Sequence, residues 1–196
     1  ALKRGAKKVK AGEAANFSFD MLGEGARTAD DAARYLEAYR EAIKAVAEDG
    51  DPSLEPEQKN GISVKLSALH PRYEAVHEPR VFDELYPRLL QLCEQAAKAN
   101  INLCLDAEEA DRLVISLKLL EKLMREPALK GWGGLGLAVQ AYQKRAHRVI
   151  ERLSQLAGET GVRLMVRLVK GAYWDTEIKH AQEEGMVNFP VFTTKH

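Results

Sequence analysis

The segment VRLMVRLVKGAYW, residues 162–174, joins an apolar run to a charged end. The run up to Val166 is typical of a buried strand, yet Arg167 continues it and Lys170-Gly171 follow. Burying a cation without a partner costs several kcal/mol. We therefore expect a negatively charged or electron-rich group at the end of this strand.

Four earlier segments have the same organisation, an apolar strand followed by a helical pattern. Strands are predicted over residues 16–20, 61–66, 101–106, 135–140 and 162–169. Helices are predicted over residues 28–50, 81–99, 111–124, 144–157 and 175–184. Thr28 is expected to cap the first of these helices, and Pro87 to bend or divide the second. This alternation predicts a parallel sheet covered by helices.

Two architectures fit such a sheet, a doubly wound fold and a (β/α)₈ barrel. No strand is followed by GxGxxG, and the glycine-rich residues 131–136 precede a strand, so a dinucleotide fingerprint is absent. The barrel is favoured because every strand has a polar residue at or near its carboxyl end, and these ends converge on one mouth in a barrel. These residues are Asp20, Lys65, Asp106, Gln140 and Arg167.

The length indicates only part of such a barrel. A complete one needs about 250 residues, whereas the chain has 196 and shows five strands. We expect one incomplete barrel domain over residues 1–196, with residues 1–15 as a leading helix or tail.

Composition excludes several function classes. Lys+Arg and Asp+Glu both number 29, so no overall field favours nucleic acid. Two cysteines without CxxC spacing indicate a reduced, cytoplasmic protein, and there is neither a membrane-length apolar run nor a signal-peptide pattern. The histidines form no HxxxH or HxH pair and GxSxG is absent, so neither a zinc site nor a hydrolase elbow is expected.

Charged residues at the predicted mouth leave alternatives open. Lys65 is a Schiff-base nucleophile, a clamp for an anionic group, or a structural ion-pair partner of Asp20 or Asp106. The acidic run over residues 106–111 could hold Mg²⁺ or begin a helix, and for Asp106 we favour a role in a site.

The residues after Arg167 suggest a cofactor. Arg167 and Lys170 lie on opposite faces of an ideal strand, so Lys170 must reach the mouth through a turn that Gly171 supplies. A cation, a glycine, a small residue and two aromatics suit a planar, phosphate-bearing cofactor. The alternative is an ordinary loop whose aromatics pack on the next helix.

Five long segments resemble a known family. FSFDMLGEGARTADDAARYLEAY (17–39), GISVKLSALHPRYE (61–74), DAEEADRLVISLKLLE (106–121), GLGLAVQAYQKR (134–145) and RLVKGAYWDTEIKHAQ (167–182) resemble the proline dehydrogenase domain of bacterial bifunctional proline utilization A. The resemblance runs from about Phe17 to His196. It implies a (β/α)₈ barrel that binds FAD and oxidises L-proline to Δ¹-pyrroline-5-carboxylate. Hydride passes from the substrate C5 to the flavin N5, and the electrons go on to a quinone.

The resemblance also implies residue roles. Lys65 would hold the proline carboxylate, Asp106 would lie beside substrate and flavin, Tyr173 would pack on the substrate, and Glu24 would gate the site by pairing with an arginine. Arg167 would lie near the flavin N5. The expected cofactor-binding residues are Gln140, Arg167, Lys170, Gly171, Ala172, Trp174 and, for the adenosine half, Thr193, Thr194 and Lys195.

Parts of the family's pattern are expected outside residues 1–196. They are a pair of carboxylate-binding arginines, the last three barrel strands and an aldehyde dehydrogenase domain. The family also implies peripheral association with the inner membrane. The 196-residue chain alone is therefore expected to bind FAD weakly and to turn over proline poorly. The competing interpretations are a Schiff-base lyase of aldolase type that uses Lys65, and a non-catalytic barrel fragment.

Overall fold

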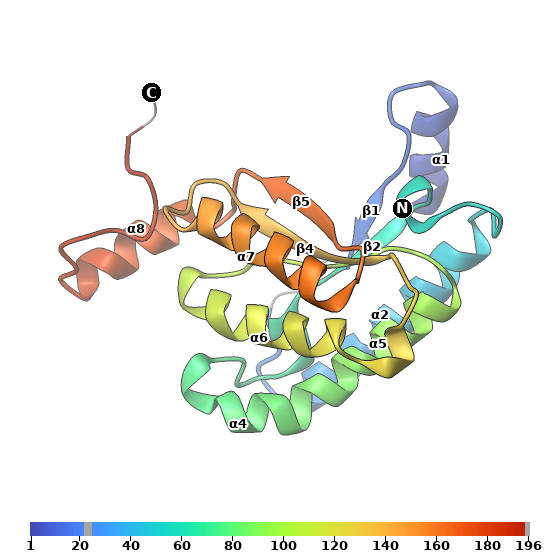
Figure 1. The fold of residues 1–196 in the computed structure, drawn as a ribbon. Helices are drawn as coiled ribbons and strands as arrows, with labels where there is room; N and C mark the ends of the chain where they lie inside the picture. Colours follow the sequence, from blue (N-terminus) through green and yellow to red (C-terminus); the bar gives the residue numbers. More distant parts are fainter. Residues whose placement is uncertain (22–24, 195–196) are drawn as a thin grey trace.

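The computed structural model describes residues 1–21 and 25–194. Five strands form one sheet: β1 (Ser18–Asp20), β2 (Gly61–Val64), β3 (Leu103–Leu105), β4 (Leu135–Gln140) and β5 (Met165–Val169). Their order in the sheet is their order in the sequence, and every neighbouring pair is parallel. A doubly wound sheet would reverse its strand order at a switch point. The described part of the chain is thus a half-barrel, as predicted (Figure 1).

Helices follow the strands as the sequence indicates. They are α1 (Leu2–Lys10), α2 (Ala29–Glu48), α3 (Leu66–Leu69), α4 (Glu78–Arg80), α5 (Tyr86–Lys98), α6 (Leu113–Met124), α7 (Ala146–Thr160) and α8 (Trp174–Glu183). Short 3₁₀ turns span Pro56–Gln58, Ala75–His77, Ala110–Arg112 and Pro127–Leu129. The predicted helix over residues 81–99 is divided, because a π-helical turn, Val81–Leu85, comes before α5. Pro87 then lies in the first turn of α5, where its missing N–H is tolerated.

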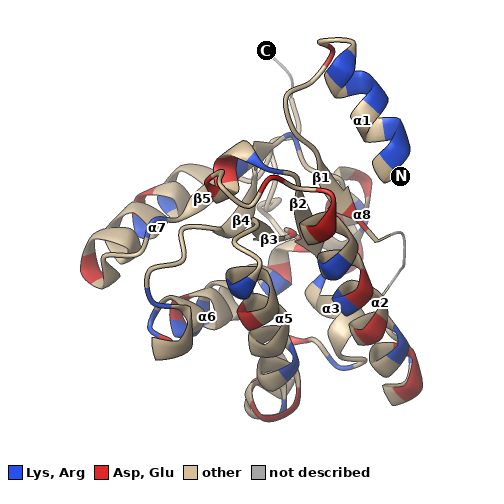
Figure 2. Ribbon diagram, turned by 90° about the vertical axis from the view of Figure 1, so that its right-hand side faces the viewer, with Lys and Arg blue, Asp and Glu red and all other residues tan. Residues whose placement is uncertain are grey.

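The leading residues form a helix rather than a tail. Figure 2 shows the lysines and arginines of α1 on a helix that stands away from the sheet beyond β1. Gly5 brings this helix against the aromatic rings before and within β1. An added Cβ at Gly5 would lie 3.2 Å from the ring of Phe17 and 3.3 Å from that of Phe19.

The capping prediction for α2 is confirmed. Thr28 Oγ1 accepts the Asp31 N–H, and the Asp31 carboxylate accepts the Thr28 N–H, both at 3.1 Å. This reciprocal pair satisfies two N–H groups at the helix start. Tyr39, Ile43 and Val46 on the same helix are buried against the sheet.

The apolar core lies between the sheet and its helices. Alternate residues of the inner strands, among them Ile62, Val64, Leu103 and Leu105, are fully buried there. Residues at the intervening positions, such as Ser63 and Cys104, lie on the other face, which is the barrel interior. The strand period thus separates an apolar outer layer from a polar inner one.

The expectation of a buried strand over residues 162–169 is wrong in two respects. Pairing begins only at Met165, after Gly161 ends α7 in a left-handed conformation. Val166 and Leu168 are also 45% and 61% exposed. The reason is coverage, because β5 pairs on one side only within the described residues and α8 continues beyond its end instead of lying along it (Figure 1).

Candidate active site

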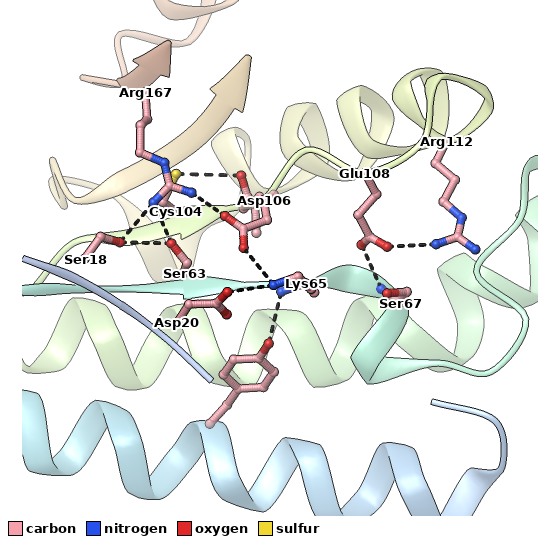
Figure 3. A network of polar contacts seen from close by, with 12 residues as sticks. Ser18, Asp20, Ser63, Lys65, Ser67, Cys104, Asp106, Glu108, Arg112 and Arg167 are labelled. Atoms are coloured by element: carbon pink, nitrogen blue, oxygen red, sulfur yellow. Dashed lines mark hydrogen bonds and ion pairs between the residues drawn. The ribbon is translucent and has the colours of Figure 1, made fainter. Parts of the chain in front are cut away.

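Two cations and two carboxylates meet at the carboxyl ends of the strands. Lys65 Nζ donates to Asp20 Oδ2 at 2.7 Å and lies 3.6 Å from Asp106 Oδ2. The Arg167 guanidinium pairs with the other oxygen of Asp106. Figure 3 shows these side chains converging on the inner face from β1, from β5 and from the residues that directly follow β2 and β3. The negatively charged group expected beside Arg167 is therefore Asp106, and Lys65 is partnered by both Asp20 and Asp106.

Lys65 lies at a turn rather than within a strand. The prediction placed it inside residues 61–66, but β2 ends at Val64 and Leu66 begins α3. The backbone N–H of Lys65 donates to the hydroxyl of the buried Tyr39 at 3.1 Å. The Tyr39 hydroxyl, from α2, thus accepts the N–H that a neighbouring strand would otherwise bind, at the point where the chain leaves the sheet.

The environment of Lys65 favours its charged form. Burial acts to lower the pKa of the ammonium, but the hydrogen bond and charge of Asp20 and the charge of Asp106 outweigh it and raise the pKa. A Schiff-base nucleophile must be a neutral amine, and enzymes usually lower the pKa of such a lysine. The structure therefore disfavours the aldolase interpretation and leaves Lys65 as an ion-pair partner or an anion clamp.

Arg167 spans the half-barrel from its last strand to its first. Its guanidinium donates to Ser63 Oγ at 2.6 Å and to Ser18 Oγ at 3.1 Å, and the two hydroxyls lie 2.9 Å apart. Its Nε is buried and has no hydrogen-bond partner among the described residues. The sequence analysis missed both serines. Ser18 precedes Asp20 by two residues, and Ser63 precedes Lys65 by two, so the strand period could have placed them on the inner face.

The residues after β5 border a hollow of about 660 Å³. Its lining residues are Ala141, Tyr142, Lys170, Gly171, Ala172, Trp174, Asp175, Phe192 and Thr194. Five of the predicted cofactor-binding residues are among them. The Trp174 indole donates to the Phe192 carbonyl at 2.8 Å, which fixes the end of the described chain against the start of α8. Thr193 lies between two lining residues and is exposed.

Gln140 is buried within a hydrogen-bond network of its own. Its amide Nε2 donates to the Glu108 carbonyl at 2.8 Å. Its Oε1 accepts the Tyr142 hydroxyl at 2.7 Å and the Ala172 N–H at 3.3 Å. Gln140 thus joins the loops after β3, β4 and β5, and its role as a cofactor ligand stays a prediction.

A second hollow, of about 400 Å³, lies beside Lys65. Lys65 and Tyr173, both predicted to contact the substrate, line it together with Glu108 and Arg112. Glu108 is buried, accepts the Ser67 N–H at 3.0 Å and pairs with Arg112 at 2.7 Å (Figure 3). It closes this side of the mouth, and the sequence analysis did not single it out.

The acidic run over residues 106–111 therefore has cationic partners. Asp106 pairs with Lys65 and Arg167, and Glu108 pairs with Arg112. Within residues 1–21 and 25–194, no group of three His, Cys, Asp or Glu side chains could hold a metal ion. Glu24 and Lys195, predicted as a gate and an adenosine contact, lie outside the described residues.

The family follows from a match that covers the whole chain. Residues 1–196 match the family described as proline dehydrogenase. The chain belongs to the proline dehydrogenase family. Curated relatives named bifunctional protein PutA are 55% identical over 181 residues in Salmonella typhimurium and 51% identical over 180 residues in Rhizobium meliloti. These matches cover 91% and 92% of this chain, which spans 14% of the length of either relative.

Solved structures of proline utilization A have the same fold over this region. A mutant of the Bradyrhizobium japonicum protein is 55% identical with a TM-score of 0.88, over 91% of this chain and 18% of that one. The Bdellovibrio bacteriovorus protein inactivated by N-propargylglycine is 28% identical with a TM-score of 0.89, over 99% and 21%. Relatives that are 55% and 28% identical to this chain thus have the same half-barrel fold over this region.

The cysteines of this family member give a first test of how closed the inner face is. Cys104 lies below Arg167 on that face, and burial raises the pKa of its thiol to about 11. Burial also raises the pKa of Cys93. Because the thiolate is the reactive form, we expect both thiols to resist iodoacetamide at neutral pH in the folded chain and to react after denaturation. Rapid labelling of native Cys104, read by mass spectrometry, would contradict a packed inner face.

Proposed function

We propose that this chain supplies the part of a proline dehydrogenase active site that holds L-proline and FAD. One observation carries the proposal: Lys65, Asp106 and Arg167 meet at the carboxyl ends of parallel strands. Barrel enzymes keep their catalytic groups at this edge. Membership of the proline dehydrogenase family supports the reaction, the oxidation of L-proline to Δ¹-pyrroline-5-carboxylate.

The residues around the larger hollow fit a flavin dinucleotide. Tyr142, Trp174 and Phe192 offer aromatic surface, and Lys170 offers a cation for a phosphate. The buried Arg167 Nε is a donor without a partner among the described residues. When bound, FAD would accept the hydride from the substrate C5. We assign Arg167, Lys170, Gly171, Ala172 and Trp174 to holding it, with Gln140, Thr193, Thr194 and Lys195 as further contacts.

Lys65 would bind the substrate carboxylate. An ammonium has three N–H donors, and Asp20 and Asp106 contact two of them from one side. The third can meet a carboxylate in the hollow that Lys65 shares with Tyr173. The two aspartates keep the lysine charged and oriented, Tyr173 would cover the apolar face of the proline ring, and Glu24 would act as the gate.

The relatives support a wider setting for this reaction. They are named bifunctional, so we propose a second, aldehyde dehydrogenase activity in the same protein. For the oxidation of proline we propose a quinone as the final electron acceptor. We also propose a cytoplasmic protein that associates peripherally with the inner membrane. Among the described residues, no helix has the length and apolar character needed to cross a bilayer.

The substrate half of the proposal is tested by thermal melting of the chain with FAD present. We expect L-proline to raise the melting midpoint and pyrrolidine, which lacks the carboxylate, to leave it unchanged. Lys65→Met should remove the response to proline, because the carboxylate loses its charged partner. Lys118→Met, which removes an exposed lysine paired with Glu78 elsewhere, is the matched control and should keep the response. Equal midpoints with proline and pyrrolidine in the unmodified chain would overturn the assignment of Lys65.

A further inference from the structure

Tyr142 connects every segment that borders the proposed FAD hollow. It lies two residues after Gln140, in the loop that follows β4. Its backbone N–H donates to the Lys170 carbonyl at 3.2 Å, and its carbonyl accepts the Phe192 N–H at 2.9 Å. The same residue therefore pairs with the turn after β5 and with the chain that follows α8.

The hydroxyl of Tyr142 lies between two residues of the proposed site. It donates to Gln140 Oε1 at 2.7 Å and accepts the Tyr173 N–H at 2.9 Å. A hydroxyl can do both at once, whereas a phenylalanine in its place could do neither. Gln140 Oε1 also accepts the Ala172 N–H. The pair formed by Tyr142 and Gln140 therefore orients the backbone of two successive residues in the turn, Ala172 and Tyr173.

The ring of Tyr142 occupies the space that Gly171 leaves open. A Cβ at Gly171 would lie 1.8 Å from Tyr142 Cε1, and φ of this glycine is +117°. Without a side chain, the turn can pass directly over the tyrosine ring. The sequence predicts that Gly171 supplies a turn after the strand, and in the structure the aromatic ring of Tyr142 fills the position of the side chain that this glycine lacks.

We propose that Tyr142 is a positioning residue for the cofactor and substrate half-sites, a role that rests on the proposed function. Its ring packs against the turn at Gly171 and fixes the position of that turn. Its hydroxyl fixes the start of α8, so that Tyr173 faces the Lys65 hollow and Trp174 faces the FAD hollow. Tyr142 acts through these residues.

The test replaces Tyr142 with phenylalanine, which keeps the ring and removes the hydroxyl. Amide hydrogen exchange of Tyr173, followed by NMR without any ligand, should become roughly tenfold faster, the size of effect expected for one lost hydrogen bond. The dissociation constant for FAD, measured by fluorescence titration, should rise roughly tenfold as well.

The matched control is Tyr86→Phe. Tyr86 is buried, and its hydroxyl donates to Glu126 at 2.7 Å, away from both hollows. It should lower thermal stability without changing Tyr173 exchange or FAD affinity, which separates positioning from general loss of structure. Unchanged Tyr173 exchange in Tyr142→Phe, or the same loss of FAD affinity in both variants, would overturn the role of Tyr142. If the unmodified chain bound no FAD, the proposed function would fail, and Tyr173 exchange alone would still decide whether Tyr142 holds the turn.

Discussion

Gly171→Ala should destabilise the chain by about 2–4 kcal/mol and remove its affinity for FAD. Two independent costs add at this position. An alanine disfavours φ of +117°, and its Cβ would lie 1.8 Å from an atom of the Tyr142 ring. The ring cannot move freely, because the hydroxyl of Tyr142 is held by Gln140 and Tyr173. For a chain of this size, the loss should lower the melting midpoint by roughly 5–15 °C.

Gly161→Ala is the control for Gly171→Ala. Gly161 also has a positive φ, +67°, but within the described part of the chain no atom lies within 4 Å of the added Cβ. It should cost only about 1–2 kcal/mol, the conformational penalty alone. Equal losses in urea denaturation for the two variants would show that the contact with Tyr142 carries no weight.

Asp106→Asn should destabilise the chain by about 2 kcal/mol, because the negative charge that pairs with the two cations is lost. The shape of the side chain is kept. Asp106 is the only carboxylate in the described network that contacts both Lys65 and Arg167, and its side chain is 12% exposed. Without it, Arg167 would lose its only carboxylate partner among the described residues, and Lys65 would keep Asp20 alone. The partial exposure of the two cations keeps the loss below that of a fully buried pair.

Two further variants separate charge from shape. Asp20→Asn removes the more exposed carboxylate, which among the described residues pairs with Lys65 alone, and should cost less than about 1 kcal/mol. Adding Arg167→Met to Asp106→Asn should recover part of the loss, since Asp106 is the only carboxylate partner of Arg167 among the described residues. A double variant less stable than Asp106→Asn by the full cost of Arg167→Met would contradict the pairing.

The sequence predicted the strands, their order and the edge where the site lies. These features follow from local patterns, because apolar runs and helix caps are encoded within a few residues of where they act. The convergence of Lys65, Asp106 and Arg167 also follows, since parallel strands bring their carboxyl ends to one edge. The inner serines follow the same period and were within reach of that reasoning.

Contacts between different loops could not be predicted in this way. The position of Tyr142 over Gly171 depends on the register of β4 and β5, in which Gln140 lies opposite Val169. Nothing in the local sequence gives that register. The exposure of Val166 and Leu168 likewise depends on which elements cover β5. A pattern of apolar residues does not indicate which element packs against a strand.

Melting the chain with and without FAD, and recording the visible spectrum of the mixture, shows whether the turn after β5 builds a flavin site. FAD at 100 times its dissociation constant should add about 2.7 kcal/mol of stability, and the visible absorbance bands of the flavin should shift from those of free FAD. The gain should grow with the logarithm of the FAD concentration and be absent in Gly171→Ala. A midpoint that does not move with FAD, together with a flavin spectrum identical to that of free FAD, would show that this turn builds no flavin site.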